Sequence, residues 1–394
     1  MADDVRDAKA VSPVITVDAE AVVVGLGALG AATTMALAQD GVEVVGLEQF
    51  ELGHALGASH GRSRALRALY DDPLYVGLVR ASVPLWRDLE AASGEALLRM
   101  CGGLYWAAPG NVLLERCRKV ALDVGLGFET LDPAEVARRF SALQIPRGSM
   151  ATFVAETGFL DADRCVAAML RAAIDAGAQV RDRAAVRRID LDGPRPLVIT
   201  DSMTYRANRL VIAAGAWAKE LLPGLALPLK VTRQGFFTFR PEVAGSTPGG
   251  RFGPDRMPVY CDYDRLLYGF PDHGPGLKVA DDNPGPETTP ETIDRSIDPA
   301  ERGRLTNWLE SLFPDATFTE IEAGTCFYTL TPDHDFILGP HPARSDVLLG
   351  VGLDHGFKFS ILFGRILADL VRHGRTGHPI DRFRVDRFVP AAAG

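Results

Sequence analysis

Three glycines and one acid near the start of the chain have the types and spacing needed to bind a nucleotide diphosphate. Gly25, Gly27 and Gly30 form a G-x-G-x-x-G run, and Glu48 follows further along. In such a run the first glycine permits a tight turn, the second lets a pyrophosphate approach the backbone, and the third lets a helix pack closely on a strand. Glu48 is placed to accept hydrogen bonds from ribose hydroxyls, which favours FAD or NAD over NADP. The residues therefore predict dinucleotide binding.

These residues need a strand, a turn, a helix and a second strand to position them. Residues 21–24 predict a short strand, residues 31–39 a helix, and residues 42–47 a second strand that ends at the acid. The diphosphate would then lie at the helix N-terminus, where unpaired N–H groups favour an anion. Glycines alone most often form ordinary turns, but here the strand, the glycine turn, the helix and the second strand follow one another in the required order. The unit as a whole predicts a nucleotide site.

Further sheet and helix elements occur throughout the chain. Residues 161–176 and 359–373 predict helices, and residues 179–181, 197–199, 209–213 and 347–351 predict strands. The stretches between are richer in Pro, Gly and aromatic residues, with a strand expected at 235–239, a loop at 281–290 and a helix at 299–313. The predicted fold class is α/β: a Rossmann-type cofactor-binding domain with an inserted α+β substrate domain built on an antiparallel sheet. The expected division is a tail at 1–18, the cofactor domain at 19–80, 150–220 and 321–394, and the substrate domain at 81–149 and 221–320.

Composition limits the possible functions. The chain has 394 residues, 47% of them hydrophobic and 24% charged, which is typical of a globular protein. A net charge of −9 excludes a generally basic nucleic-acid binder. The acidic start does not resemble a signal peptide, and no apolar run approaches the roughly 18 residues of a membrane span. We expect a protein of the cytoplasm that binds neither nucleic acid nor membrane.

Cysteine and lysine usage is unusual. The five cysteines are odd in number, widely spaced and without a C-x-x-C pair, which argues against a disulfide framework and against a zinc site. No metal site is predicted. Only six of the 42 basic residues are lysines.

From residue 57 onward the chain resembles one family. The segment Gly57-Ala-Ser-His-Gly-Arg-Ser-Arg-Ala-Leu-Arg67 is similar to the monomeric sarcosine oxidase and N-methyltryptophan oxidase group, within the FAD-dependent D-amino-acid-oxidase-like superfamily. The glycine unit, residues 325–333 and residues 355–359 match as well, and residues 268–278 match more weakly. The resemblance covers about residues 20–388 and implies FAD as the cofactor.

The resemblance also implies where the flavin is held. Cys326 occupies the position of a family cysteine that bonds to the flavin 8α-methyl group, so covalent FAD is expected. The other four cysteines are expected to be small buried hydrophobes. Gly215 and Trp217 match a segment near the FAD, although strand packing would explain Trp217 almost equally well. With the glycine unit, the cofactor-binding set comprises Gly25, Gly27, Gly30, Glu48, Ser59, His60, Gly215, Trp217, Cys326, His355, Gly356 and Lys358.

Catalytic and substrate roles follow from the same likeness. Lys278 matches a lysine that promotes reaction with dioxygen, and Arg64 matches an arginine beside the flavin ring. Arg67 and Lys358 match a pair that clamps the substrate carboxylate, a task that suits a guanidinium fork. Several aromatic residues match pocket positions, with ordinary core packing as the alternative: Tyr70, Tyr75, Tyr268 and Tyr328.

One departure bears on the substrate. Where sarcosine-oxidising members have a histidine four residues after the oxygen-activating lysine, this chain has Asp282, and its neighbour Asp281 leaves the assignment open by one residue. A carboxylate favours a cationic or N–H-donating group on the substrate, so we expect Asp282 to influence protonation of the substrate nitrogen. An acid at this position also resembles the family branch that oxidises cyclic imino acids. The turn before Lys358 is also one residue shorter than in sarcosine oxidase.

The expected activity is FAD-dependent oxidation of a secondary amino acid or cyclic imino acid. The C–N bond becomes an imine, a hydride passes to flavin N5, and dioxygen, the second small-molecule partner, becomes hydrogen peroxide. A monomer is expected. Three alternatives stay open: a flavin-dependent amino acid dehydrogenase with another electron acceptor, a nicotinamide-dependent reductase, and a non-catalytic flavin- or nucleotide-binding subunit.

Overall fold

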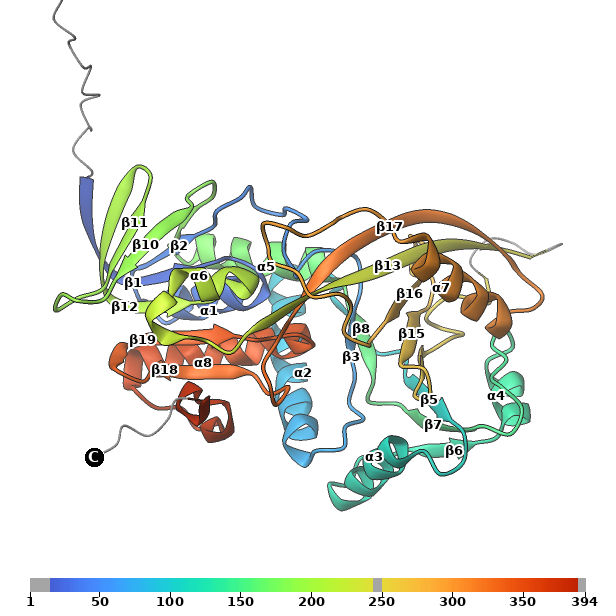
Figure 1. Cartoon of the computed structure of the whole chain (residues 1–394). Coiled ribbons are helices and arrows are strands. Elements are labelled where there is room, and N and C mark those ends of the chain that lie inside the picture. The colour runs from blue at the N-terminus through green and yellow to red at the C-terminus, as the bar shows by residue number, and fades with distance from the viewer. Residues whose placement is uncertain (1–14, 244–249, 389–394) are drawn as a thin grey trace, which may run out of the picture.

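The first sheet is built around strand β1 (Ile15–Val24), which lies between two parallel neighbours. In the computed structural model, which describes residues 15–243 and 250–388, this sheet occupies the left half of Figure 1. Its path runs β10-β11-β12-β1-β2-β9, and β19 joins β12 and carries β18 at its side. The further bounds are β2 Val44–Leu47, β9 Gln179–Arg181, β10 Val186–Asp190, β11 Leu197–Thr200, β12 Met203–Ile212, β18 Ile337–His341 and β19 Arg344–Val351.

Both faces of this sheet are buried, as expected for parallel strands. Successive residues of β1 alternate between two hydrophobic clusters, with Ala21 and Val23 on one side and Val22 and Val24 on the other. Helices α1 (Ala28–Gln39), α5 (Ala162–Asp175) and α8 (Ser360–His373) pack together on the first side (Figure 1). The strand–turn–helix–strand unit is confirmed, but α1 begins at Ala28, three residues before its expected start. Gly27 is the N-cap, so the helix begins within the glycine run.

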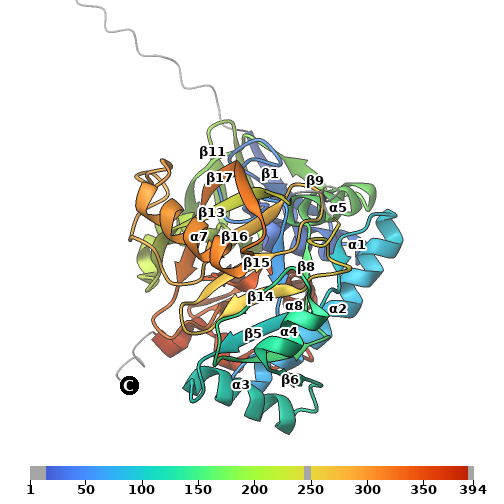
Figure 2. The same cartoon turned by 90° about the vertical axis from the view of Figure 1, so that its right-hand side faces the viewer.

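A second sheet fills the other half of the molecule, and its strands face the viewer in Figure 2. Its order is β17-β13-β16-β15-β14-β5-β7-β6, antiparallel except for the pair β14 and β5. The two long strands β13 (Lys230–Glu242) and β17 (Thr317–Leu330) pair along their whole length and extend toward the first sheet (Figure 1). The others are β5 Gly103–Ala107, β6 Glu129–Leu131, β7 Met150–Val154, β14 Val259–Asp262, β15 Leu267–Phe270 and β16 Leu277–Asp281.

The remaining elements connect and cover the two sheets. A small third sheet has the order β3-β8-β4 and lies between the larger ones. Helix α7 buries Leu305 and Trp308 against the second sheet, which accounts for the apolar spacing of that segment. The bounds are β3 Arg64–Leu66, β4 Leu98–Arg99, β8 Gly158–Leu160, α2 Pro73–Ser93, α3 Val112–Asp123, α4 Pro133–Arg139, α6 Ala218–Leu221 and α7 Pro299–Leu312.

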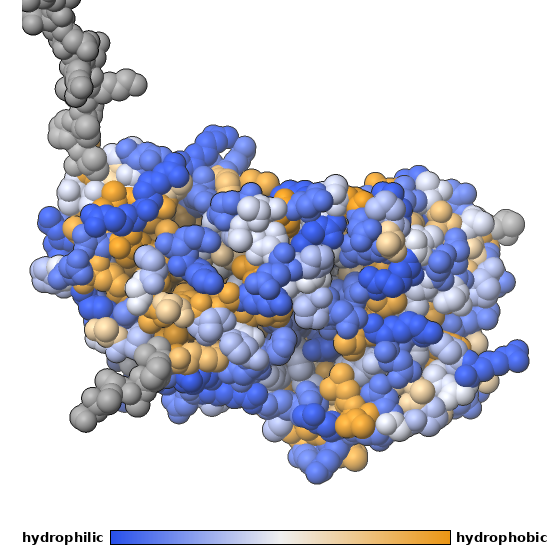
Figure 3. Space-filling view, viewed as in Figure 1, coloured by the Kyte–Doolittle hydropathy of each residue, from blue (hydrophilic) through white to orange (hydrophobic). Residues whose placement is uncertain are grey.

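The fold confirms the predicted class, with three boundaries to correct. The expected tail is wrong at its end, because residues 15–18 already belong to β1, where they pair with β12; residues 1–14 lie outside the described residues. Residues 150–154 and 321–330 were assigned to the cofactor domain, but they belong to the second sheet, because β7 pairs with β5 and β17 pairs with β13. None of the described helices is long and apolar enough to cross a membrane. On the face drawn in Figure 3, polar residues separate several small apolar regions, one of them near β12 and β19.

Candidate active site

The glycine run forms a backbone cradle at the end of β1. Gly25 has a φ of +87°, and a Cβ there would lie 2.7 Å from the carbonyl oxygen of Ala213. A Cβ on Gly30 would lie only 1.7 Å from the carbonyl oxygen of Gly25, so this glycine lets α1 pack against the turn. The Ala28 N–H donates to Ser59 Oγ at 2.9 Å. The N-terminus of α1 lines the cavity described below, at the place where a helix favours an anion.

Glu48 is fixed at the end of β2. Its carboxylate accepts hydrogen bonds from the backbone N–H groups of Leu26 at 2.9 Å and Phe50 at 3.1 Å, and His54 Nε2 lies 3.4 Å away. Burial, the largest influence, raises the pKa of Glu48, but the contacts with His54, Leu26 and Phe50 together hold that pKa below its usual value. The acid beside the cradle therefore stays ionised.

A cavity of about 820 Å³ extends between the two sheets from this cradle. Its walls come from the ends of β1 and β2, from the loop over residues 57–64, and from β13, β15, β16 and β17. Most of the predicted site residues line it, although they are far apart in the sequence: Gly25, Gly27, Glu48, Ser59, His60, Arg64, Arg67, Gly215, Trp217, Tyr268, Lys278, Asp282, Cys326, Tyr328, His355, Gly356 and Lys358. Gly30, Tyr70 and Tyr75 do not line it.

Features at both ends of the cavity fit a bound FAD. The volume lies in the upper range of cofactor sites. At the cradle, a Cβ on Gly27 would lie 2.8 Å from Ser59 Oγ, so glycine lets the loop with Ser59 approach this turn. Further along, the buried His60 Nε2 has no hydrogen-bond partner among the described residues. Burial and then the charge of Arg64 lower the pKa of His60 to about 4, so its ring is neutral toward a ligand.

Among the cysteines, Cys326 has the setting that a covalent link would need. It lies on β17 opposite Gln234 of β13, and its half-buried side chain lines the cavity. Cys261 lines the cavity too, but burial and then Asp282 raise the pKa of its thiol. Burial likewise raises the pKa of Cys101 and Cys117 to about 11, and that of Cys165 as well. Those four thiols stay protonated, and Cys101 is half-buried rather than fully buried.

Lys278 is a buried ammonium on β16 that lines the cavity. Its Nζ donates to the carbonyl oxygen of Ser63 at 3.1 Å and lies 4.9 Å from the ring centroid of Phe236 and 5.4 Å from that of Phe270. Burial and then the nearby charge of Arg64 lower the pKa of Lys278 to about 7. Arg64 itself donates to the carbonyl oxygens of Ala58, His60 and Ser63, which fixes it under the loop.

Arg67 and Lys358 present two positive charges to the same part of the cavity. Arg67 Cζ lies 4.4 Å and Lys358 Nζ 5.8 Å from the ring centroid of Tyr70. Lys358 Nζ donates to the carbonyl oxygen of His355 at 2.6 Å. Arg67 makes no hydrogen bond or ion pair to another residue in the described ranges. A half-buried guanidinium that forms no ion pair within the described residues and faces a cavity favours a bound carboxylate.

The structure settles which of the two neighbouring acids faces the cations. Asp282 Oδ1 accepts a hydrogen bond from the Tyr328 hydroxyl at 3.1 Å, inside the cavity. Asp281 instead pairs with Arg304 of α7 at 2.6 Å and with the side chain of Asn283. Because successive side chains of a strand point to opposite sides, only one of the pair can lie beside Tyr328.

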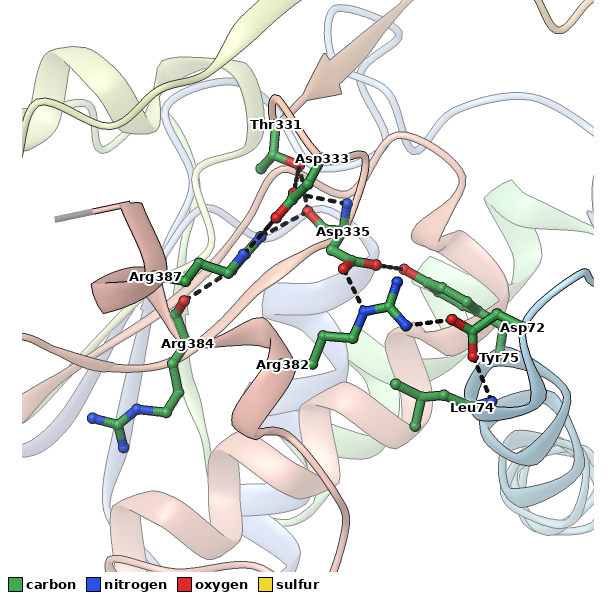
Figure 4. Close-up of polar contacts among 9 residues, drawn as sticks. All are labelled: Asp72, Leu74, Tyr75, Thr331, Asp333, Asp335, Arg382, Arg384 and Arg387. Carbon is green, nitrogen blue, oxygen red and sulfur yellow. Dashed lines mark hydrogen bonds and ion pairs between the residues drawn. The ribbon is translucent and has the colours of Figure 1, made fainter.

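Tyr75 lies behind the site rather than in its wall. Its hydroxyl donates to Asp335 Oδ1 at 2.7 Å, and Arg382 binds the other oxygen of Asp335 and also Asp72, the N-cap of α2 (Figure 4). Tyr75 stacks on Tyr70 with 5.2 Å between ring centroids. These two tyrosines therefore support Arg67 and Lys358 from outside the cavity, and a C-terminal segment holds them in place.

Two cavity residues were missed by the sequence analysis. Asp354, in the turn before Lys358, is half-buried and lines the cavity, as does the buried Tyr105 of β5. An acid in the shortened turn was the available signal for Asp354, whereas nothing local marks Tyr105. Residues 15–243 and 250–388 contain no group of three or more His, Cys, Asp or Glu side chains placed to hold a metal ion.

Comparison with known proteins defines the class. The family model described as FAD dependent oxidoreductase matches residues 20–370, so the chain belongs to this family of flavoenzymes. Within it the chain belongs to the sarcosine oxidase-like amine oxidases, which act on the CH–NH group of their donors. The expected family and fold are thereby confirmed.

Individual relatives cover nearly the whole chain. Monomeric sarcosine oxidase of Streptomyces avermitilis is 36% identical over 385 residues, which cover 95% of this chain and 99% of that protein. N-methyl-L-tryptophan oxidase of Yersinia pestis is 27% identical over 384 residues, which cover 94% of this chain and 100% of that protein. The chain is also similar to the solved structure of NikD, an unusual amino acid oxidase essential for nikkomycin biosynthesis, with a TM-score of 0.83 and 26% identity. The superposition covers 93% of this chain and 97% of NikD.

Proposed function

We propose that this protein is an FAD-dependent oxidase of a secondary or cyclic amino acid, which converts the C–N bond to an imine and dioxygen to hydrogen peroxide. The FAD, when bound, takes two electrons from the substrate and passes them to dioxygen. The observation that carries the proposal is the unpaired guanidinium of Arg67 beside the buried ammonium of Lys358. Both lie in the cavity that the glycine cradle opens. The similarity to oxidases of N-methylated amino acids supports the same activity.

The side chains of this cavity bind and orient the substrate rather than react covalently with it. Arg67 and Lys358 hold the carboxylate, and Tyr70 keeps the two cations in place. Asp282, held by Tyr328, faces the substrate nitrogen and favours an N–H donor there, as a cyclic or N-alkyl amino acid supplies. Orientation of this kind accounts for a large share of the rate in such reactions. Lys278 places a positive charge where dioxygen is reduced.

A flavin dehydrogenase with another electron acceptor is the alternative. The buried Lys278 favours the oxidase, because a fixed ammonium in a cavity of low dielectric stabilises the negative charge that develops on dioxygen. We also propose that the first sheet binds the cofactor while the second covers its substrate end, as the division of the cavity walls supports. Action as a monomer in the cytoplasm stays a prediction.

A substrate screen tests the proposed function. We expect sarcosine, proline, pipecolate or piperideine-2-carboxylate to bleach the flavin absorbance of the purified protein without oxygen, and to yield one peroxide per substrate in air. Bleaching without peroxide, with fast turnover on an artificial electron acceptor, would favour the dehydrogenase. A flavoprotein that none of these or related amines reduces would contradict the proposal.

We further propose that Cys326 holds the flavin by a thioether. Acid precipitation of the wild-type protein should then leave the yellow colour in the pellet, whereas Cys326→Ser should release the flavin to the supernatant. Cys261→Ser is the matched control, because Cys261 also lines the cavity but has a thiol that burial keeps protonated. It should retain the colour in the pellet. Free flavin from the wild-type protein would show that no covalent link exists.

A further inference from the structure

Amine oxidation of the proposed kind requires that a proton leave the substrate first. The reacting nitrogen must be uncharged to give up electrons, whereas an alkyl ammonium has a pKa of roughly 10 and binds protonated near neutral pH. The inference that follows rests on the proposed function. Within a closed cavity the proton needs an acceptor close to the nitrogen.

The position of that acceptor follows from the carboxylate clamp. Nitrogen and carboxylate of an α-amino acid are attached to one carbon, so a group that touches the nitrogen must lie beside Arg67 and Lys358. Asp354 fulfils this condition, since it lies in the same tight turn as Lys358 and lines the same cavity. Its side chain is 14% exposed, and the cavity is where that exposed surface lies.

Three of the charged or titratable groups that face Asp354 are poor acceptors, and the fourth is an acid. Lys358 of its own turn and Arg67, which follows β3, are cations. His355 is half-buried, and desolvation together with the charges of Lys358 and Arg67 lowers the pKa of its ring far below the usual value. Asp282, at the end of β16, is the other acid near this point: its Oδ1 accepts the hydroxyl of Tyr328, and it lies outside the turn that carries Lys358.

Asp354 keeps one oxygen available. Its Oδ1 accepts the backbone N–H of His355 at 2.6 Å and lies 3.1 Å from the Nδ1 of the same residue. Its Oδ2 has no hydrogen-bond partner in the described part of the chain. This oxygen is therefore free to accept a proton from a ligand in the cavity.

We propose that Asp354 is a catalytic residue that removes the proton from the substrate ammonium before oxidation. In this step an N–H bond of the substrate breaks, an O–H bond forms on Asp354, and the electron pair stays on nitrogen. No electrons are transferred to or from the protein. In this part of the cavity, the cations Arg67 and Lys358 and the acid Asp354 then match a zwitterionic amino acid, which binds by its carboxylate and delivers its proton to the acid.

The electrostatics of the turn suit this role. Burial is the largest influence and, with the neighbouring charge of Asp282, raises the pKa of Asp354 to about 7, although His355 N–H, Lys358 and Arg67 act in the opposite direction. A base is most effective when its pKa lies near the working pH. Since the ionised form accepts the proton, substrate oxidation should accelerate as the pH rises through about 7.

The test compares two substrates in the holoenzyme. One is an N-ethyl amino acid, and the other is its N-(2,2,2-trifluoroethyl) analogue, whose amine is already uncharged at neutral pH. Flavin bleaching without oxygen is followed from about pH 6 to about pH 10 in the wild type, Asp354→Asn and Asp282→Asn. Binding of isobutyrate, a carboxylate without an amine, reports whether the clamp of each variant is intact.

At neutral pH, Asp354→Asn should slow the basic amine about a hundredfold more than the fluorinated one, as expected for loss of a general base. The difference should vanish at high pH, where solvent has already removed the proton. Asp282→Asn should separate the two substrates far less than Asp354→Asn does, because it removes a neighbour of the nitrogen but leaves the acceptor in place. A larger separation by Asp282→Asn would assign the proton transfer to Asp282 and overturn the role of Asp354. Equal slowing of both substrates by Asp354→Asn, with isobutyrate still bound, would overturn the role of Asp354 and leave the proposed function standing. A wild-type flavin that no amine reduces would overturn both.

Discussion

Replacement of Arg67 by methionine is expected to lower kcat/KM for amino acid substrates about a thousandfold. Removal of one partner of a buried ion pair costs about 4 kcal/mol, and each 1.36 kcal/mol corresponds to roughly a tenfold change. Arg67 has no other ion pair among the described residues, so the whole loss would fall on the substrate carboxylate. Burial opposes its charge, but Tyr70, Tyr263 and Asp282 hold its pKa above the usual value, so the charge persists at any working pH.

The methyl ester of the same substrate provides the control. Because the ester has no carboxylate, wild-type protein should oxidise it poorly, and Arg67→Met should cause little additional loss. Arg67→Lys should give an intermediate rate, since it retains the charge but not the two-pronged hydrogen bonding. Steady-state kinetics with both substrates measure the effect. An equal loss with acid and ester would mean that Arg67 does not bind the carboxylate.

Replacement of Lys278 by methionine is expected to slow the reaction with dioxygen by about a hundredfold to a thousandfold, the usual effect of removing one fixed electrostatic stabiliser. The reaction of the flavin with substrate should change far less, because Lys278 does not belong to the carboxylate clamp. Stopped-flow mixing of the substrate-reduced protein with oxygenated buffer measures the first rate, and mixing without oxygen measures the second.

The low pKa of Lys278 adds a pH signature to this prediction. A lysine with a pKa of about 7 is cationic below that pH and neutral above it. The oxygen reaction of the wild type should therefore slow as the pH rises through about 7. Lys278→Arg should remove this dependence while it keeps the charge, and Lys278→Met should remove both. A variant without the ammonium that still reacts rapidly with oxygen would assign oxygen activation to another group.

Local patterns were enough to predict the cofactor cradle. The turn at Gly25, the helix after Gly27 and the acid at Glu48 depend on residues close together in the chain, where glycine conformation and helix geometry decide the outcome. The start of α1 was predicted three residues late, because apolar spacing does not show that a helix can begin inside a glycine run. Helix α2, with its N-cap Asp72, was not predicted at all.

The substrate end of the cavity depended on pairing between distant segments. Strands β13 and β17 bring Cys326 opposite Gln234, and β16 brings Lys278 beside the loop at Ser63. The sequence resemblance could name these residues, but it left Asp281 and Asp282 undecided. Strand alternation and the contact with Tyr328 decided between them.

The sequence by itself determined the FAD-type cradle, the α/β class and most of the residues that line the cavity, because these reside in local motifs of fixed spacing. Only the tertiary structure showed that Tyr75 lies behind the site, bonded to Asp335, and that Asp354 lies inside it. The physical reason is that the direction of a side chain and the charges around it depend on packing between elements far apart in the chain. An isolated aspartate or tyrosine in a sequence carries no record of those neighbours.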